Sequence, residues 1–131
     1  MTDATPPTPP TQGSASADWP RPLVHFEIEA RDPQRQREFY AALFNWDITD
    51  GPIMNTSTGI GSPIDGIGGH IRQSNRSAFN LYFQVRDLAS SLAKTVALGG
   101  SVETEPFQFP GTPTMAVIAD PEGNTIVFVQ Q

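Results

Sequence analysis

One nine-residue pattern occurs twice in this chain, and this repeat limits the possible folds more than any other feature. The segment VHFEIEARD at residues 24–32 corresponds to FNLYFQVRD at residues 79–87, at a constant offset of 55 residues. Each copy ends in Arg-Asp and is followed by a helical pattern. Because such a unit is too small to bury a core alone, the repeat predicts two copies of one supersecondary unit packed together. We expect a functional site in the space between the copies.

Composition excludes several classes of function. A chain of 131 residues is long enough for one domain with a core of its own. The absence of cysteine rules out disulfides, a thiolate nucleophile and zinc–thiolate sites. A net charge of −6 argues against a nucleic-acid partner, which requires clustered Lys and Arg. The sequence shows neither a membrane-spanning apolar run nor the pattern of a signal peptide, so we expect a cytoplasmic protein without a membrane partner.

The chain divides into a tail and one domain. Residues 1–20 are rich in Pro, Thr and Ser and poor in large apolar residues, which predicts a disordered tail. Residues 21–131 are predicted to form a single domain with two modules, at 21–76 and 77–131.

Both modules show the same order of elements. Asp32 and Asp87 each follow an alternating strand and are predicted to cap a helix. Phe39, Tyr40, Leu43 and Phe44 form one stripe on the first helix, which we expect to lie on a sheet. Strands are predicted at 23–30, 46–48, 53–57, 69–73, 79–85, 101–105, 114–119 and 125–130. A glycine-rich connection at 59–69 does not match a phosphate-binding loop. The predicted fold class is α+β, with two βαβββ modules.

Three segments carry a resemblance to a known superfamily. They are the strand end Ala30–Pro33, the segment REFYAALFNW at 37–46, and DPEGN at 120–124, before the final strand. In this order, inside a repeat, they make the chain similar to the vicinal oxygen chelate superfamily of glyoxalases, bleomycin-resistance proteins and extradiol dioxygenases. The resemblance implies an open, barrel-like cup of mixed sheet with helices outside. It does not imply one reaction, because such folds host many chemistries.

The resemblance also implies positions for a metal site. In metal-binding relatives, up to four ligands come from the first and last strands of each module. These positions correspond here to His25, His70, Asn80 and Val127. Many relatives have Glu where Val127 stands, and Asn80 is a poor ligand. Half of the expected ligand set is therefore missing.

The two histidines of the chain can still be interpreted in two ways. Glu27 lies two residues after His25 on the same strand face, so His25, His70 and Glu27 could hold a divalent Zn, Ni, Mn or Fe ion. Glu27 could alternatively act as a catalytic base. The competing interpretation makes the histidines a polar lining of the cup or a subunit contact. For Glu27 and Glu29, it predicts a strand face in contact with water.

The second module offers candidate ligand-binding residues. Asn80, Tyr82 and Gln84 lie on one strand face and, with His25, could position a small molecule by hydrogen bonds. Phe107 and Phe109 lie on a segment rich in Pro and Gly that could cover the mouth of the cup. The alternatives are a half-exposed strand, a dimer contact or simple packing. Trp46 is expected in the core.

Two functions follow from these observations. The favoured one is a glyoxalase/bleomycin-resistance-like protein that binds a small molecule between its modules without a complete metal site. The alternative is a metal-dependent lyase, isomerase or dioxygenase acting on vicinal oxygens, with His25 and His70 as ligands. A purely structural role is a third possibility. Exposed sheet edges predict a homodimer.

Overall fold

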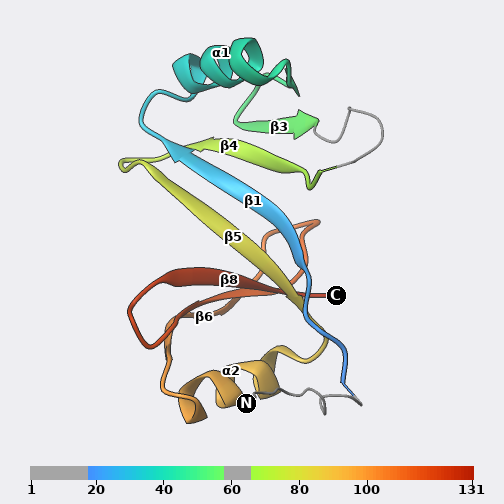
Figure 1. The fold of residues 1–131 in the computed structure, drawn as a ribbon, viewed down its shortest axis with the longest axis vertical. Helices are drawn as coiled ribbons and strands as arrows, with labels where there is room; N and C mark the ends of the chain where they lie inside the picture. The colour runs from blue at the N-terminus through green and yellow to red at the C-terminus, as the bar shows by residue number, and fades with distance from the viewer. Residues whose placement is uncertain (1–17, 58–65) are drawn as a thin grey trace, which may run out of the picture.

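The computed structural model describes residues 18–57 and 66–131. Most of the predicted tail and part of the glycine-rich connection lie outside these residues. The described part contains eight strands and two helices (Figure 1). They are β1 (Leu23–Ala30), α1 (Pro33–Phe44), β2 (Asp47–Ile48), β3 (Ile53–Ser57), β4 (Gly69–Gln73), β5 (Ala78–Val85), α2 (Leu88–Ala97), β6 (Ser101–Phe107), β7 (Met115–Ala119) and β8 (Thr125–Gln130).

The eight strands form one mixed sheet in the order β2-β3-β4-β1-β5-β8-β7-β6. The first strands of the modules, β1 and β5, pair antiparallel at its centre, and each is flanked by the parallel last strand of its own module. The sheet does not close, and α1 and α2 lie at opposite ends of the molecule (Figure 1). The predicted α+β cup of two βαβββ modules is therefore confirmed.

The strand register also confirms the alignment of the repeat. Glu27 pairs with His70 in module one, and Tyr82 pairs with Val127 in module two. Glu27 and Tyr82 are related by the offset of 55 residues, and His70 and Val127 correspond when the last strands of the two modules are aligned. His70 and Val127 therefore occupy corresponding places in the two halves.

Both helices begin where the sequence predicted. The Asp32 carboxylate accepts a hydrogen bond from the Arg35 backbone N–H at 3.1 Å, and Asp87 accepts one from Ser90 at 3.2 Å. Each side chain satisfies an N–H group that the first helical turn leaves without a partner. Within the described residues, neither helix is both long enough and apolar enough to cross a membrane.

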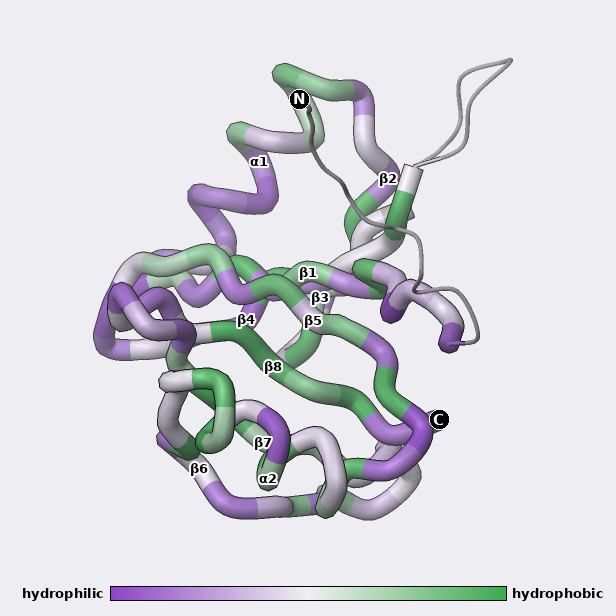
Figure 2. Tube along the Cα trace, turned by 60° about the horizontal axis from the view of Figure 1, so that its bottom comes forward, coloured by the Kyte–Doolittle hydropathy of each residue, from purple (hydrophilic) through white to green (hydrophobic). Residues whose placement is uncertain are grey.

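Each module has its own hydrophobic cluster. Trp46 packs on the first cluster, as expected from the sequence. Figure 2 shows consecutive hydrophobic residues along β8, which lies next to the central pair of strands. The first cluster comprises Phe26, Ile28, Ala30, Ile48, Met54 and Ile71, and the second comprises Val85, Leu88, Leu92, Ala116 and Ile118.

The predicted stripe of α1 is not buried on the sheet, and this expectation was wrong. Phe39, Leu43 and Phe44 are each more than half exposed, and only Tyr40 and Ala41 of the helix pack against the first cluster. The face of α1 that contacts the sheet is narrower than the apolar stripe of the helix. The remaining apolar side chains belong to the molecular surface.

Gly69 allows β4 to pack closely beside β1. It pairs with Phe26, and a Cβ atom at this position would lie 2.5 Å from the Phe26 ring. Any larger residue would displace an aromatic side chain of the first core cluster. This close packing sets the position of His70, the next residue of β4.

Candidate functional site

Two carboxylates lie buried side by side on the inner face of β1. Glu27 and Glu29 are each only 6 % exposed. The interpretation of these residues as a water-facing strand surface was therefore wrong. Because two buried charges of the same sign repel, they require compensating donors and cations.

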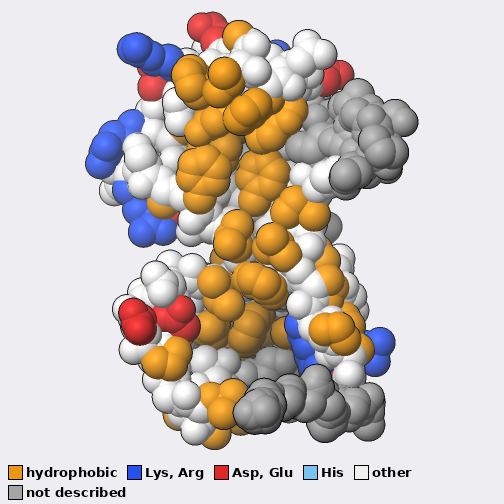
Figure 3. Space-filling view, viewed as in Figure 1, with side chains coloured by type: hydrophobic (Ala, Val, Ile, Leu, Met, Phe, Trp, Pro, Cys, Tyr) orange, Lys and Arg blue, Asp and Glu red, His pale blue; other side chains and the backbone are white. Residues whose placement is uncertain are grey.

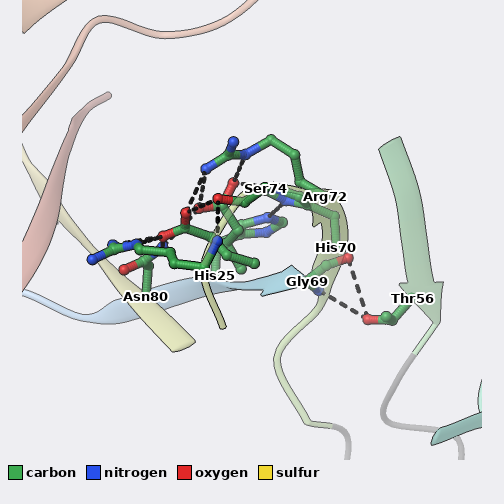
Figure 4. Close-up of polar contacts among 10 residues, drawn as sticks. His25, Thr56, Gly69, His70, Arg72, Ser74 and Asn80 are labelled. Atoms are coloured by element: carbon green, nitrogen blue, oxygen red, sulfur yellow. Dashed lines mark hydrogen bonds and ion pairs between the residues drawn. The ribbon is translucent and has the colours of Figure 1, made fainter. Parts of the chain in front are cut away.

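Glu27 receives hydrogen bonds from three side chains (Figure 4). Its Oε2 accepts from His70 Nε2 at 2.8 Å and from Arg72 Nε at 2.7 Å. Its Oε1 accepts from Asn80 Nδ2 at 2.8 Å and from Arg72 Nη2 at 3.3 Å. Burial alone would raise the pKa of Glu27, but the hydrogen bonds from His70, Arg72 and Asn80 outweigh it and lower the pKa to about 2. Such a carboxylate is a weak base at neutral pH.

Glu29 is held in a similar way. Its Oε2 accepts from Arg76 Nη2 at 2.6 Å and from Asn80 Nδ2 at 2.7 Å, while Ser74 Oγ donates to its Oε1 at 2.8 Å. Arg72 Nη2 also lies 3.3 Å from Glu29 Oε1. The hydrogen bond from Arg76 contributes most to lowering the pKa of Glu29 to about 2, with burial opposing it. Two guanidinium groups thus neutralise two carboxylates.

The histidines extend this network in a defined order. His70 Nε2 must donate to Glu27, because an ionised carboxylate only accepts hydrogen bonds. In neutral His70, Nδ1 then accepts from His25 Nε2, which lies 2.7 Å away. Burial is the main cause that lowers the pKa of His25, and it favours the neutral form of this side chain. His25, His70 and Glu27 therefore form a hydrogen-bonded chain.

This arrangement does not fit a metal ion. The three predicted ligands lie together, but His70 uses one ring nitrogen for His25 and the other for Glu27. The Arg72 guanidinium, itself a cation, lies against both carboxylates. In the described part of the chain, no three His, Cys, Asp or Glu side chains are arranged to hold an ion. A metal could bind only after these hydrogen bonds were broken.

The network forms one wall of two adjoining cavities inside the cup. The first has a volume of about 470 Å³ and is lined mainly by module two, and the second, of about 460 Å³, is lined equally by both modules. Both are bordered by Glu27, Arg72, Tyr82, Phe109 and Met115. A partly apolar cavity of this size with a few polar groups is typical of small-molecule sites.

Comparison with protein families agrees with this geometry. A family model described as a glyoxalase-like domain matches residues 25–129, which includes both modules and the network between them. The chain belongs to the glyoxalase-like domain family. A search among curated proteins found no match to this glyoxalase-like domain.

Several solved structures share the fold of this glyoxalase-like domain. A variant of methylmalonyl-CoA epimerase from Streptomyces coelicolor, in complex with 2-nitronate-propionyl-CoA, matches with a TM-score of 0.59 and 13 % identity, over 83 % of this chain and 96 % of that chain. A glyoxalase/bleomycin resistance protein/dioxygenase superfamily member from Vibrio splendidus 12B01 matches with a TM-score of 0.59 and 15 % identity, over 86 % and 100 %. At these identities, the matches establish the fold.

The structure of the glyoxalase-like domain brings most predicted site residues to the cup. His25 and His70 line the second cavity, Asn80 and Phe107 line the first, and Tyr82 and Phe109 border both. Gln84 does not line either of these cavities.

Burial, followed by the charge of Glu27, raises the pKa of Tyr82 to about 12, so its hydroxyl stays protonated.

Sequence reasoning missed the cationic half of the network. Arg72 and Arg76, together with Ser74, were not among the predicted site residues of this glyoxalase-like domain. One signal was available, because Arg72 lies two residues after His70 and strand alternation puts both on one face. Arg76 lies beyond the end of β4, where alternation makes no prediction.

Proposed function

We propose that this glyoxalase-like domain binds a small molecule in the cup between its two modules, without a complete metal site. The observation that carries the proposal is the pair of cavities bordered by a self-contained network of Glu27, Glu29, Arg72 and Arg76. Internal hydrogen bonds satisfy the carboxylates, while aromatic and aliphatic side chains supply an apolar wall. The structure of the epimerase with a CoA derivative supports a ligand-binding role for this fold. A cytoplasmic location stays a prediction.

The alternative is a metal-dependent lyase, isomerase or dioxygenase with His25 and His70 as ligands. The hydrogen-bonded chain from His25 to Glu27 opposes it, since both nitrogens of His70 are already used. We therefore place the metal-free function first. If the alternative were correct, purified protein would contain a near-stoichiometric divalent metal, and His70→Ala would lose it.

A neutral fluorescent dye tests whether the cup binds small molecules. Because the dye is uncharged, its binding does not depend on attraction to the carboxylates or the arginines of the network. We expect N-phenylnaphthylamine to bind chelator-treated protein, because the first cavity has an apolar wall of suitable size. Thr104→Trp places an indole in that cavity and should weaken binding by about tenfold or more. Glu122→Trp, in an exposed turn, is the matched control and should not change it.

Two outcomes would contradict the proposal. The first is equal dye binding by the wild type and Thr104→Trp, which would place the dye outside the cup. The second is dye binding that requires added Zn, Ni, Mn or Fe.

An apolar face of the molecule is a better candidate interface for the predicted homodimer than the sheet edges are. The edge strand β6 exposes Glu103, Glu105 and Pro106, which disfavour pairing with another strand. Instead, exposed apolar side chains form a continuous band on the face seen in Figure 3. Phe39, Phe44 and Phe79 are each more than half exposed and surround Tyr40, at ring-centroid distances of 5.1, 6.0 and 6.4 Å, respectively. We call these four residues the aromatic patch.

We propose that a second copy of the chain covers the aromatic patch. The patch contains no charged residue, so two copies of a chain with a net charge of −6 can meet there without bringing like charges into contact. We expect light scattering after size exclusion to give a dimer mass, and Phe39→Ser with Phe79→Ser to give a monomer. Phe109→Ser removes an equally exposed ring at the cup and should leave the dimer intact. A monomeric wild type at high concentration would contradict this prediction.

A further inference from the structure

The balance between available hydrogen-bond donors and available acceptors in the cup favours one class of ligand over another. Three of the four oxygens of Glu27 and Glu29 accept hydrogen bonds from at least two internal donors, and the fourth, Glu29 Oε1, accepts one from Ser74 and lies 3.3 Å from Arg72 Nη2. Although the site contains two buried carboxylates, they have little accepting capacity left for a ligand. A cationic or donor-rich molecule would find no free carboxylate oxygen.

Donors, in contrast, remain available on the same wall. The Tyr82 hydroxyl borders both cavities and has no hydrogen-bond partner among the described residues. Arg72 and Arg76 bind the carboxylates through Nε and Nη2, which leaves the Nη1 group of each guanidinium unpaired within that part of the chain. Both arginine side chains are partly exposed, at 41 % and 58 %. They can therefore be reached from the first cavity, which both of them line.

The remaining lining of the first cavity sets the shape of the ligand. Phe107, Phe109, Met115, Val117 and Val127 supply an apolar wall. The hydroxyls of Thr104 and Thr125 can donate or accept, so they do not favour either kind of ligand. The cavity thus combines an apolar wall with a donor-bearing wall.

From this asymmetry, and building on the proposed binding function, we propose that the cup takes molecules with an apolar, flat body and a carboxylate or carbonyl group. The acceptor oxygens lie against Tyr82, Arg72 and Arg76, and the body lies against Phe107 and Phe109. A carboxylate is preferred to a neutral carbonyl, because hydrogen bonds from guanidinium to an anion are the stronger ones. In this proposal, the positive charge of the Arg72 guanidinium attracts the ligand oxygens, as a metal cation would.

Three naphthalene derivatives of nearly equal size test the inference. Naphthoate carries a carboxylate, acetonaphthone a neutral carbonyl, and naphthylmethylammonium a cation. In calorimetric titrations of the full chain, we expect naphthoate to bind about tenfold more tightly than acetonaphthone and the ammonium compound to bind most weakly.

Two substitutions assign the preference to named groups. Tyr82→Phe removes a hydroxyl that makes no hydrogen bond to any residue at 18–57 or 66–131, so it should preserve the fold and weaken naphthoate binding by about tenfold. Arg76→Lys keeps a cation beside Glu29 but removes Nη1, and should weaken naphthoate binding severalfold. Neither change should alter the binding of the ammonium compound. Thermal melting of each variant checks that it is folded.

The outcomes separate this inference from the proposed function. Binding of all three compounds with equal affinity, lost in Thr104→Trp, would overturn the ligand class and leave binding in the cup standing. The same holds for tighter binding of the ammonium compound, or for unchanged naphthoate binding by folded Tyr82→Phe. If none of the compounds, nor the neutral dye, binds in a manner sensitive to Thr104→Trp, the proposed function itself fails.

Discussion

Glu27→Gln is expected to destabilise the fold by about 3 kcal/mol, although the side chain keeps its size. Gln would remove a negative charge and turn an NH₂ group toward His70, Arg72 and Asn80, all of which donate to this position. Breaking a buried ion pair at one end costs about 3–5 kcal/mol, and solvent around the 41 % exposed Arg72 side chain reduces that cost. Urea denaturation gives the free energy of unfolding directly.

Two comparisons identify the cause of this loss. Glu105→Gln changes an exposed carboxylate on β6 and should alter stability by less than about 0.5 kcal/mol. Arg72→Met alone should also destabilise the fold, but the double variant with Glu27→Gln should lose less than the two single losses combined. A loss below about 1 kcal/mol in Glu27→Gln would show that the network contributes little to stability.

Acid is expected to destabilise the protein mainly between pH 4.5 and pH 2. In the folded state, the pKa values of Glu27 and Glu29 are about 2, below the ordinary value of 4.5. Folding therefore favours the ionised carboxylates, and this stabilisation is complete above pH 4.5 and is lost as the pH falls through 2. The combined loss is roughly 3–5 kcal/mol, after allowance for the exposure of both arginines.

Chemical denaturation at a series of pH values measures this dependence. Glu29→Gln should lower stability at neutral pH and flatten the acid limb, because one of the two shifted carboxyls is gone. Glu105→Gln should leave the shape of the curve unchanged. A stability that stays constant from pH 5 to about 2.5 would contradict the assignment of ionised, hydrogen-bonded carboxylates in the cup.

Much of the fold could be predicted because it depends on local patterns. The alternation in residues 24–32 and 79–87 predicted β1 and β5, and the Asp32 and Asp87 caps predicted the start of both helices. The repeat predicted that the modules are equivalent, which the pairing of Glu27 with His70 and of Tyr82 with Val127 confirms. Strand alternation and helix capping involve near neighbours in the chain, so they can be identified without knowledge of the tertiary structure.

The site was harder to predict, because its chemistry depends on contacts between distant segments. Alternation places Glu27 and Glu29 on one face of β1, but it does not reveal whether water or a second layer of side chains meets that face. Their partners Arg72 and Arg76 lie more than forty positions away in sequence. The same limitation explains the exposed stripe of α1, since the helical period shows which side chains share a face and not whether another surface covers that face.

The sequence by itself determined that the chain contains two equivalent βαβββ modules with polar residues on the inner faces of their first strands. Only the tertiary structure decided that these inner faces form a charge-compensated network in which both ring nitrogens of His70 are engaged in hydrogen bonds. The physical reason is that the ionisation and hydrogen bonding of a side chain depend on what surrounds it in three dimensions. For Glu27, that surrounding is supplied by β4 and β5 together.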